Sequence, residues 1–290
     1  MPVIKVSDCE DLAKILQKAG LDDKPVWIKV NWTSPDQGMF TEPATLKRIL
    51  SVISRPVTLL ESYSIGRVNG PLDELPDNEQ DYIQAMRNAD RRFLKTTGID
   101  EILKMPSVSY FNLTEAINAG EAAPAHEVKE IVTSAVEHPI NFPELYNHVP
   151  QNMYRHRGKV TLLNLARMKV PAVNSGDWSL ALKNMFGLIT TPDRRKFHQQ
   201  DLVGAILDIN CIYRSLFNVV DVVEALNSAV IYGYDGQYKA PWGNYDLYTD
   251  ETLVAYDTNP VLLELAVAEY FDKDLSDRTL IRRAKEIWPL

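Results

Sequence analysis

Cysteine is scarce in this chain, which has only Cys9 and Cys211 among its 290 residues. Neither cysteine belongs to a CxxC pair or to a Cys/His cluster with metal-ligand spacing, so we expect both to be buried thiols. An iron–sulfur cluster normally takes about four cysteine ligands. The sequence therefore predicts a protein that holds no iron–sulfur cluster by itself.

Positive charge in excess and long apolar runs are missing as well. Lys and Arg number 31 against 39 Asp and Glu, which gives a formal net charge of -8. A nucleic-acid surface needs clustered Lys and Arg in excess, so this balance argues against one. No run approaches the roughly 18 to 20 apolar residues of a membrane helix, and the first residues lead into a polar segment rather than a signal peptide. We therefore expect a cytoplasmic protein that binds neither nucleic acid nor a membrane.

The sequence does contain alternating strand and helix patterns, in a composition typical of globular proteins. A strand at Val26–Trp32, a helix from Pro43 to about Ile53 and a strand at Val57–Glu61 form a β-α-β unit, which predicts a parallel sheet. Further strands are expected at Lys159–Ala166, Asn218–Val223 and Thr252–Asp257. We predict an α/β fold, a mainly parallel sheet with flanking helices, as one domain over residues 1–290 or as two lobes that meet near residues 120–158. Val128–Val136 fits either a helix or a strand.

Polar side chains stand at the carboxyl end of the first predicted strand. Side chains alternate along a strand, so Lys29 and Asn31 share a face and would point together. Thr41 is a candidate N-cap for the helix that follows, with Pro43 in its first turn. A polar strand end beside a helix N-terminus is a common geometry for holding an anion. An ordinary β-loop-α connection with Lys29 at its rim explains the same residues, because no P-loop or GxGxxG pattern is present.

A second polar cluster follows the strand at 159–166. Lys169 lies just beyond that strand, where an open sheet presents residues to a ligand. The stretch Trp178–Ile189 has apolar residues at roughly helical spacing and places Lys183 and Asn184 side by side at its edge. With Arg194, Arg195 and His198 downstream, these residues would form a donor-rich pocket for a carboxylate or phosphate. The competing interpretation, which spacing alone favours, is an amphipathic helix followed by a solvated basic turn.

Two carboxylates in predicted strands raise the question of a metal. Asp221 is flanked by valines, and a carboxylate there is costly unless paired, so a functional role and a structural salt bridge both stay open. Asp257 is either a ligand or the cap of the helix that follows it. His198 with Asp221 and Asp257 offers the nitrogen and oxygen ligands used by iron, manganese or zinc, so one version of the hypothesis adds a divalent metal.

Several of these pieces together resemble the family named domain of unknown function 362. The block Lys183-Asn184-Met185-Phe186-Gly187 is the most specific match, and the strand with Lys29 and Asn31 is similar to the family's lysine–asparagine strand. The other matching pieces are weaker one by one: Gly38–Pro43, Glu61-Ser62, Asn164–Lys169, His198, Asp221, Gly233 and Asp257.

The chain departs from that family in two ways. The family often continues its lysine strand as Lys-Thr-His, whereas Lys169 is followed by Val170 and Pro171, so the resemblance supports no role for that histidine. Many relatives also carry ferredoxin-type cysteine motifs, which are absent here. The resemblance therefore implies no electron-transfer role.

Our leading hypothesis is an enzyme that acts on a small anionic metabolite. Lys29, Asn31, Thr41, Lys169, Lys183 and Asn184 would bind its carboxylate or phosphate, with Lys169 and Lys183 also close to the chemistry. His198 would act as general acid or base, with Glu61, Asp221 or Asp257 orienting it or holding a cation. The competing hypothesis is a noncatalytic cofactor-binding or partner subunit that lost its relatives' cysteine motifs. A homodimer would be unsurprising for such a protein.

Overall fold

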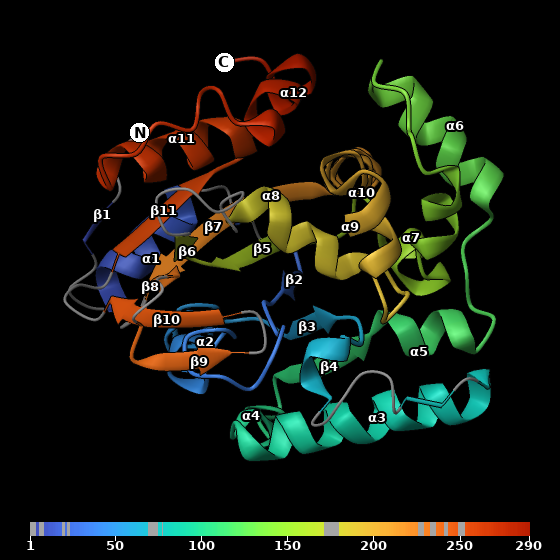
Figure 1. Ribbon diagram of the computed structural model, residues 1–290, viewed down its shortest axis with the longest axis horizontal. Coiled ribbons are helices and arrows are strands. Elements are labelled where there is room, and N and C mark those ends of the chain that lie inside the picture. Colours follow the sequence, from blue (N-terminus) through green and yellow to red (C-terminus); the bar gives the residue numbers. More distant parts are fainter. Residues whose placement is uncertain are drawn as a thin grey trace.

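The computed structural model describes residues 4–5, 9–18, 21, 24–68, 75–76, 78–170, 180–225, 229–232, 236–240, 243–248 and 253–290. Within these residues, the central sheet has seven strands in the order β1-β11-β7-β5-β2-β3-β4 (Figure 1). The five strands from β7 to β4 are parallel to one another, whereas β11 runs antiparallel to both β7 and β1. The predicted α/β fold with a mainly parallel sheet is confirmed. The strand bounds are β1 (Ile4–Lys5), β2 (Val26–Lys29), β3 (Val57–Glu61), β4 (Val108–Asn112), β5 (Thr161–Arg167), β7 (Asn218–Ala225) and β11 (Leu253–Asp257).

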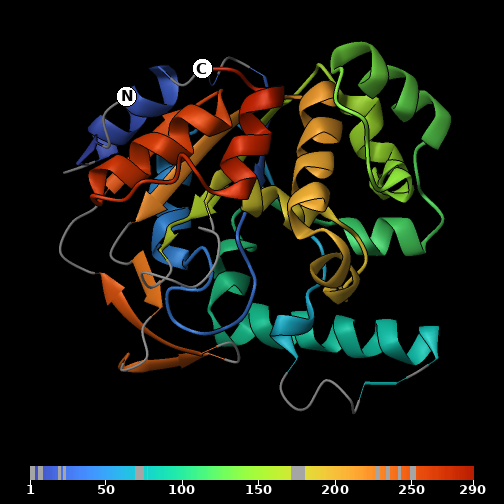
Figure 2. The same ribbon diagram turned by 45° about the horizontal axis from the view of Figure 1, so that its top comes forward.

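Helices cover both faces of this sheet (Figures 1 and 2). One hydrophobic core joins the sheet to α1, α2, α3 and α4, and the other joins it to α5, α6, α7, α8, α10, α11 and α12. The segment from α6 to α7 packs against α10 at one side of the molecule. No helix in the described part of the chain is long and apolar enough to cross a membrane. The helix bounds are α1 (Cys9–Lys18), α2 (Pro43–Ser51), α3 (Glu79–Thr96), α4 (Ile99–Ile102), α5 (Leu113–Asn118), α6 (Ala125–Ala135), α7 (Gln151–His156), α8 (Ala181–Asn184), α9 (Arg195–Gln200), α10 (Leu202–Leu216), α11 (Pro260–Tyr270) and α12 (Thr279–Ile287), with 3-10 turns η1 (Ile65–Arg67), η3 (Pro143–His148) and η4 (Met185–Leu188).

The alternation predicted for the first strand is present in β2. Ile28 belongs to the core under α2, whereas Trp27 belongs to the core on the opposite face. Every residue of β5 is buried, as expected for a central parallel strand covered on both faces. Asn164 is the polar exception in the middle of β5. A buried amide must find hydrogen-bond partners, so this residue marks a polar site inside the fold.

A small second sheet, in the order β6-β8-β10-β9, was not expected from the sequence. Its strands are β6 (Lys169–Val170), β8 (Ala229–Tyr232), β9 (Tyr238–Ala240) and β10 (Gly243–Tyr248). The paired strands β10 and β9 lie at one edge of the molecule (Figures 1 and 2). The hydroxyl of Tyr245 donates to the carbonyl oxygen of Gln37 at 2.8 Å, which ties the sheet to the loop after β2. Lys169 thus begins a strand of its own instead of trailing β5.

Several local predictions need correction. Thr41 does not cap α2, because Glu42 is at the N-cap position and the Thr41 hydroxyl accepts from the backbone N–H of Asn31 instead. Asp257 does not cap α11 either, since the Asn259 side chain accepts from the N–H groups of Val261 and Leu262. The predicted helix at 178–189 is two short turns, α8 and η4, and Trp178 and Ser179 lie outside the described residues. The ambiguous segment 128–136 is helical, as part of α6.

Candidate functional site

A buried ion pair stands at the carboxyl ends of β2 and β3. Nζ of Lys29 lies 3.0 Å from Oε2 of Glu61, and the lysine is only 1% exposed. The backbone N–H groups of Trp32 and Ser62 also donate to this carboxylate, so Glu61 is held by three donors. Burial lowers the pKa of Lys29, and the negative charge of Glu61 opposes that shift. Glu61, one of the three carboxylates that the sequence offered either to orient His198 or to hold a cation, is thus paired with Lys29.

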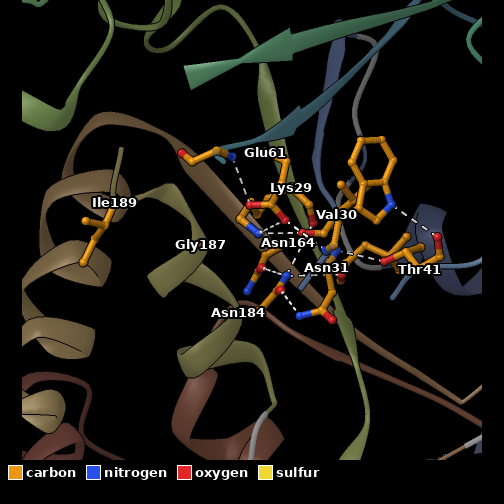
Figure 3. A network of polar contacts seen from close by, with 12 residues as sticks. Lys29, Val30, Asn31, Thr41, Glu61, Asn164, Asn184, Gly187 and Ile189 are labelled. Carbon is orange, nitrogen blue, oxygen red and sulfur yellow. Dashed lines mark hydrogen bonds and ion pairs between the residues drawn. The ribbon is translucent and has the colours of Figure 1, made fainter. Parts of the chain in front are cut away.

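Gly187 in η4 lies directly against this ion pair (Figure 3). A Cβ atom at this position would be 2.6 Å from Nζ of Lys29 and 2.8 Å from Oε1 of Glu61. Those separations are too short for any side chain. The glycine is thus required by the close approach of the η4 backbone to the pair.

Three asparagines form a directed chain of amides across the same sheet edge (Figure 3). Nδ2 of Asn31 donates to Oδ1 of Asn184 at 2.9 Å, and Nδ2 of Asn184 donates to Oδ1 of Asn164 at 2.7 Å. One end of the chain is a lysine amine, because Nζ of Lys169 donates to Oδ1 of Asn31 at 2.7 Å. The other end is an anion, because Nδ2 of Asn164 donates to Oδ1 of Asp221 at 2.7 Å. The donor at one end, Nζ of Lys169, and the accepting carboxylate of Asp221 at the other end fix the orientation of all three amides.

Asp221 is the anchor of this chain and forms a structural ion pair. Its carboxylate is fully buried and accepts from Nη2 of Arg214 at 2.7 Å. Burial raises the pKa of Asp221, and Arg214 and Asn164 oppose the rise. The sequence left open whether Asp221 has a functional role or forms a structural salt bridge. The structure contains an ion pair between Asp221 and Arg214.

The three predicted metal ligands do not form one group. Asp221 and Asp257 are paired across β7 and β11, but His198 is on α9. Within the described ranges, no three His, Cys, Asp or Glu side chains are arranged to hold a metal ion. Cys211 is a free, buried thiol, and its burial raises its pKa to about 12, as expected for an unreactive cysteine.

Lys169 is a buried lysine of this site that has no carboxylate partner among the described residues. It is 4% exposed, and Asn31 supplies its neutral hydrogen-bond acceptor. Burial lowers its pKa to about 7, and the positive charges of Lys183, Arg167 and Lys29 act in the same direction, against a smaller opposing effect of Glu61. A substantial share of Lys169 is therefore neutral at neutral pH.

Comparison with known proteins identifies the family of this chain. Residues 26–269 match the model of a family described as Domain of unknown function (DUF362), which is more than half of the chain. The chain belongs to the DUF362 family. No curated protein matches it. A crystal structure of a Thermotoga maritima protein, from a structural genomics consortium, is 14% identical, with a TM-score of 0.32 over 96% of this chain and 58% of the other. The chain thus spans less than two thirds of that protein's length.

The sequence pieces that resembled DUF362 meet at one place in the fold. Lys29 ends β2 and Asn31 follows it in the next loop, Asn164 comes from β5, and Asn184 and Gly187 come from the turns after residue 180 (Figure 3). Direct hydrogen bonds or close approach join them, although they are far apart in the sequence. Gly233, a further DUF362 match, lies outside the described residues.

His198 and Lys183 are more exposed than the buried residues that match DUF362. His198 is exposed and packs edge-to-face on Phe186, with 5.8 Å between the ring centroids. Burial of part of its ring, together with the charges of Lys183 and Arg194, lowers the pKa of His198. Lys183 is half-buried and lowers the pKa of both His198 and Lys169. Lys183 thus lies within electrostatic reach of both groups.

Sequence reasoning missed or underrated three residues of the site. Asn164 links Asn184 to Asp221, and an asparagine within an apolar strand was the signal for it. Arg214 neutralises Asp221 from helix α10, and no sequence pattern pairs it with that strand. Arg194 donates to the carbonyl oxygens of Tyr63, Gly187 and Ile189, and burial lowers its pKa to about 10. Its guanidinium thereby holds η4 in place over the ion pair.

Proposed function

We propose that this protein is an enzyme that acts on a small metabolite bearing a carboxylate or phosphate group. The ligand would bind at the carboxyl edge of β2 and β5, next to Lys169 and Lys183. This edge is where ligands collect in open parallel α/β sheets. The observation that carries the proposal is Lys169, a buried amine with an amide as its acceptor and with cations on three elements around it.

Charge balance favours an anionic ligand. Lys29 is compensated by Glu61, and Arg167 is paired with Glu224 at 3.2 Å. Lys169 has no such carboxylate among the described residues. A carboxylate or phosphate beside Lys169 would supply the missing negative charge and would form charge-assisted hydrogen bonds.

Acid–base chemistry in this proposal belongs to Lys169 and His198. A general base works best when its pKa is close to the working pH, and the pKa of Lys169 is about 7. The lowered pKa of His198 makes its ring a proton acceptor at neutral pH. Lys183 would hold the anion between them. Lys29, Asn31, Thr41 and Asn184 would keep Lys169 and η4 in position, because hydrogen bonds within the protein already engage their side chains.

Binding and turnover can be tested separately. Inorganic phosphate and malonate are simple probes for binding, measured by calorimetry with the wild type, Lys183→Ala and Lys159→Ala. Lys159 is an exposed lysine next to the opposite end of β5, so its variant is the matched control. We expect Lys183→Ala to weaken binding about tenfold or more, the loss of one charge-assisted contact, and Lys159→Ala to leave it unchanged.

Turnover is tested by incubating the protein with a mixture of carboxylated and phosphorylated metabolites and following each compound by mass spectrometry. The wild type should consume one compound and form a product, and Lys169→Met should not. Binding without any turnover would identify a noncatalytic binding subunit instead of an enzyme. Unchanged binding and turnover in Lys183→Ala would refute the proposed anion site.

A further inference from the structure

Two buried lysines of the site differ in their partners. Nζ of Lys29 has the carboxylate of Glu61 at 3.0 Å, which favours its charged form. Nζ of Lys169 has only the neutral amide oxygen of Asn31 at 2.7 Å among the described residues. A neutral amine has a lone pair that can attack a carbon atom, whereas an ammonium has none. The structure therefore separates a lysine that is paired with a carboxylate from one whose acceptor is a neutral amide.

Charged groups on four elements act on Lys169. Lys183 on α8, Arg167 on β5 and Lys29 on β2 are positive, and Glu61 on β3 is the negative group that opposes them. A lysine desolvated beside other cations is a recognised way to obtain an amine nucleophile at neutral pH. With a pKa of about 7, Lys169 has roughly a thousandfold larger neutral fraction at pH 7 than an ordinary lysine of pKa about 10.4.

We propose that Lys169 forms a Schiff base with the carbonyl carbon of a 2-oxo acid. This inference rests on the proposed function, because it uses the same anion site, and it names the substrate class and the reacting atom. The lone pair on Nζ forms a bond to the carbonyl carbon, while the C=O π electrons move to oxygen, which takes up a proton. Nζ then loses a proton, and the carbinolamine loses its oxygen as water to give the C=N bond. The net change is amine plus ketone to imine plus water, without oxidation or reduction.

The charges around Lys169 also explain why the substrate should carry a carboxylate next to its carbonyl group. A protonated imine on Lys169 would be a cation among Lys183, Arg167 and Lys29. Those charges disfavour it, as they disfavour the lysine ammonium. A carboxylate bonded to the imine carbon brings its own negative charge into the site. We therefore expect 2-oxo acids to react and neutral ketones of the same size to react much less.

Reductive trapping tests this directly. The full-length protein is incubated at pH 7 with pyruvate and sodium cyanoborohydride, which reduces an imine to a stable secondary amine. Parallel samples contain acetone in place of pyruvate, or pyruvate with excess malonate, an anion that has no ketone. Intact-mass and peptide mass spectrometry then locate any N-carboxyethyl group. We expect modification of Lys169 by pyruvate, at least tenfold less by acetone, and protection by malonate.

The outcomes separate this inference from the proposed function. Peptide mapping uses the wild-type protein, so its result does not depend on whether a variant folds. Modification at Lys183 or Lys29 in place of Lys169 would overturn the inference. Lys169→Met should lose the adduct, while Lys159→Met should keep it. Malonate binding in calorimetry without a pyruvate adduct would overturn the Schiff base and leave the anion site standing. If malonate does not bind and no adduct forms, both the Schiff base and the proposed function are refuted.

Discussion

Nζ of Lys169 lies 2.7 Å from Oδ1 of Asn31, so a buried amine has a neutral amide as its hydrogen-bond acceptor. The amide cannot reverse, because its Nδ2 donates to Asn184. The neutrality of this acceptor is one reason why the pKa of Lys169 can fall to about 7. The charge at position 31 should therefore control the chemistry of Lys169.

Asn31→Asp should raise the pKa of Lys169 toward its ordinary value. A carboxylate at hydrogen-bond distance favours the ammonium, and such a contact is worth roughly 1 to 3 pH units. Competitive acetylation with acetic anhydride over a pH series measures this, because only neutral amines react. We expect the midpoint for Lys169 to move from near pH 7 to about pH 8 or higher. Lys159 in the same sample is the internal reference, and an unmoved midpoint would argue against control by Asn31.

Gly187→Ala should damage the site and the stability of the fold together. The new Cβ atom would meet Nζ of Lys29 and Oε1 of Glu61 at less than 3 Å, so the buried ion pair must move. Overpacking of this kind costs about 1 to 3 kcal/mol in the free energy of unfolding. Urea denaturation measures that cost, and calorimetry with malonate should show weaker binding.

Gly158→Ala is the matched control for this prediction. Gly158 has a positive φ of 70°, but a Cβ atom there meets nothing within 4 Å. Its substitution should cost about 1 kcal/mol through backbone strain and leave malonate binding unchanged. Equal effects of the two variants on binding would show that contact with the ion pair is not the cause.

Arg214→Met should destabilise the protein in a pH-dependent way. Burial raises the pKa of Asp221, and loss of Arg214 raises it further. Below the unfolded value of about 3.9, the carboxyl is protonated in both states, so the missing arginine costs little. As the pH rises above that value, the unfolded chain releases its proton first, which favours unfolding until the folded carboxyl also ionises. We expect a cost of about 3 to 5 kcal/mol at pH 7 and a smaller one near pH 4.

Urea unfolding of the wild type and Arg214→Met at pH 4.5 and 7.5 checks the direction. Arg283→Met is the control, because its partner Asp201 is 40% exposed and such surface pairs contribute at most about 1 kcal/mol. A cost for Arg214→Met that is equal at both pH values would mean that Asp221 does not carry the charge that Arg214 neutralises.

The sequence predicted those parts of the fold and site that depend on local periodicity. Alternation along a strand predicted at Val26–Trp32 placed Lys29 and Asn31 together. The strand β2 ends already at Lys29, but both side chains belong to the polar network at its carboxyl end. The apolar run around Leu163 predicted a buried strand, and β5 is fully buried. These features depend on the alternation of side chains and on hydrophobicity, both of which can be recognised within a few consecutive residues.

The contacts that complete the site come from distant segments and were not predictable in that way. Arg214 looked like one more polar residue of a helix, and only packing of α10 on β7 brings it to Asp221. Thr41 looked like a helix cap, but its hydroxyl accepts from Asn31 because the loop after β2 folds back on the strand. Residues in short strands such as β6 carry too few side chains for a recognisable period. No local pattern in the sequence identifies the partner of any of these residues.

His148 should make the fold lose stability as the pH falls through the window from about 6.5 to 4. Its Nδ1 atom accepts from the backbone N–H of Thr190 at 3.0 Å, and burial, with Lys196 and Arg194 nearby, lowers its pKa to about 4. The unfolded histidine takes up a proton near pH 6.5 while the folded one stays neutral, so protons favour unfolding in that window. His148→Asn keeps an acceptor for Thr190 but cannot be protonated, and it should remove about 2 kcal/mol of the loss between pH 7 and 4. Urea unfolding across this range measures it, with the exposed His126→Asn as the control that keeps the wild-type slope. An unchanged slope in His148→Asn would place the acid sensitivity in other groups.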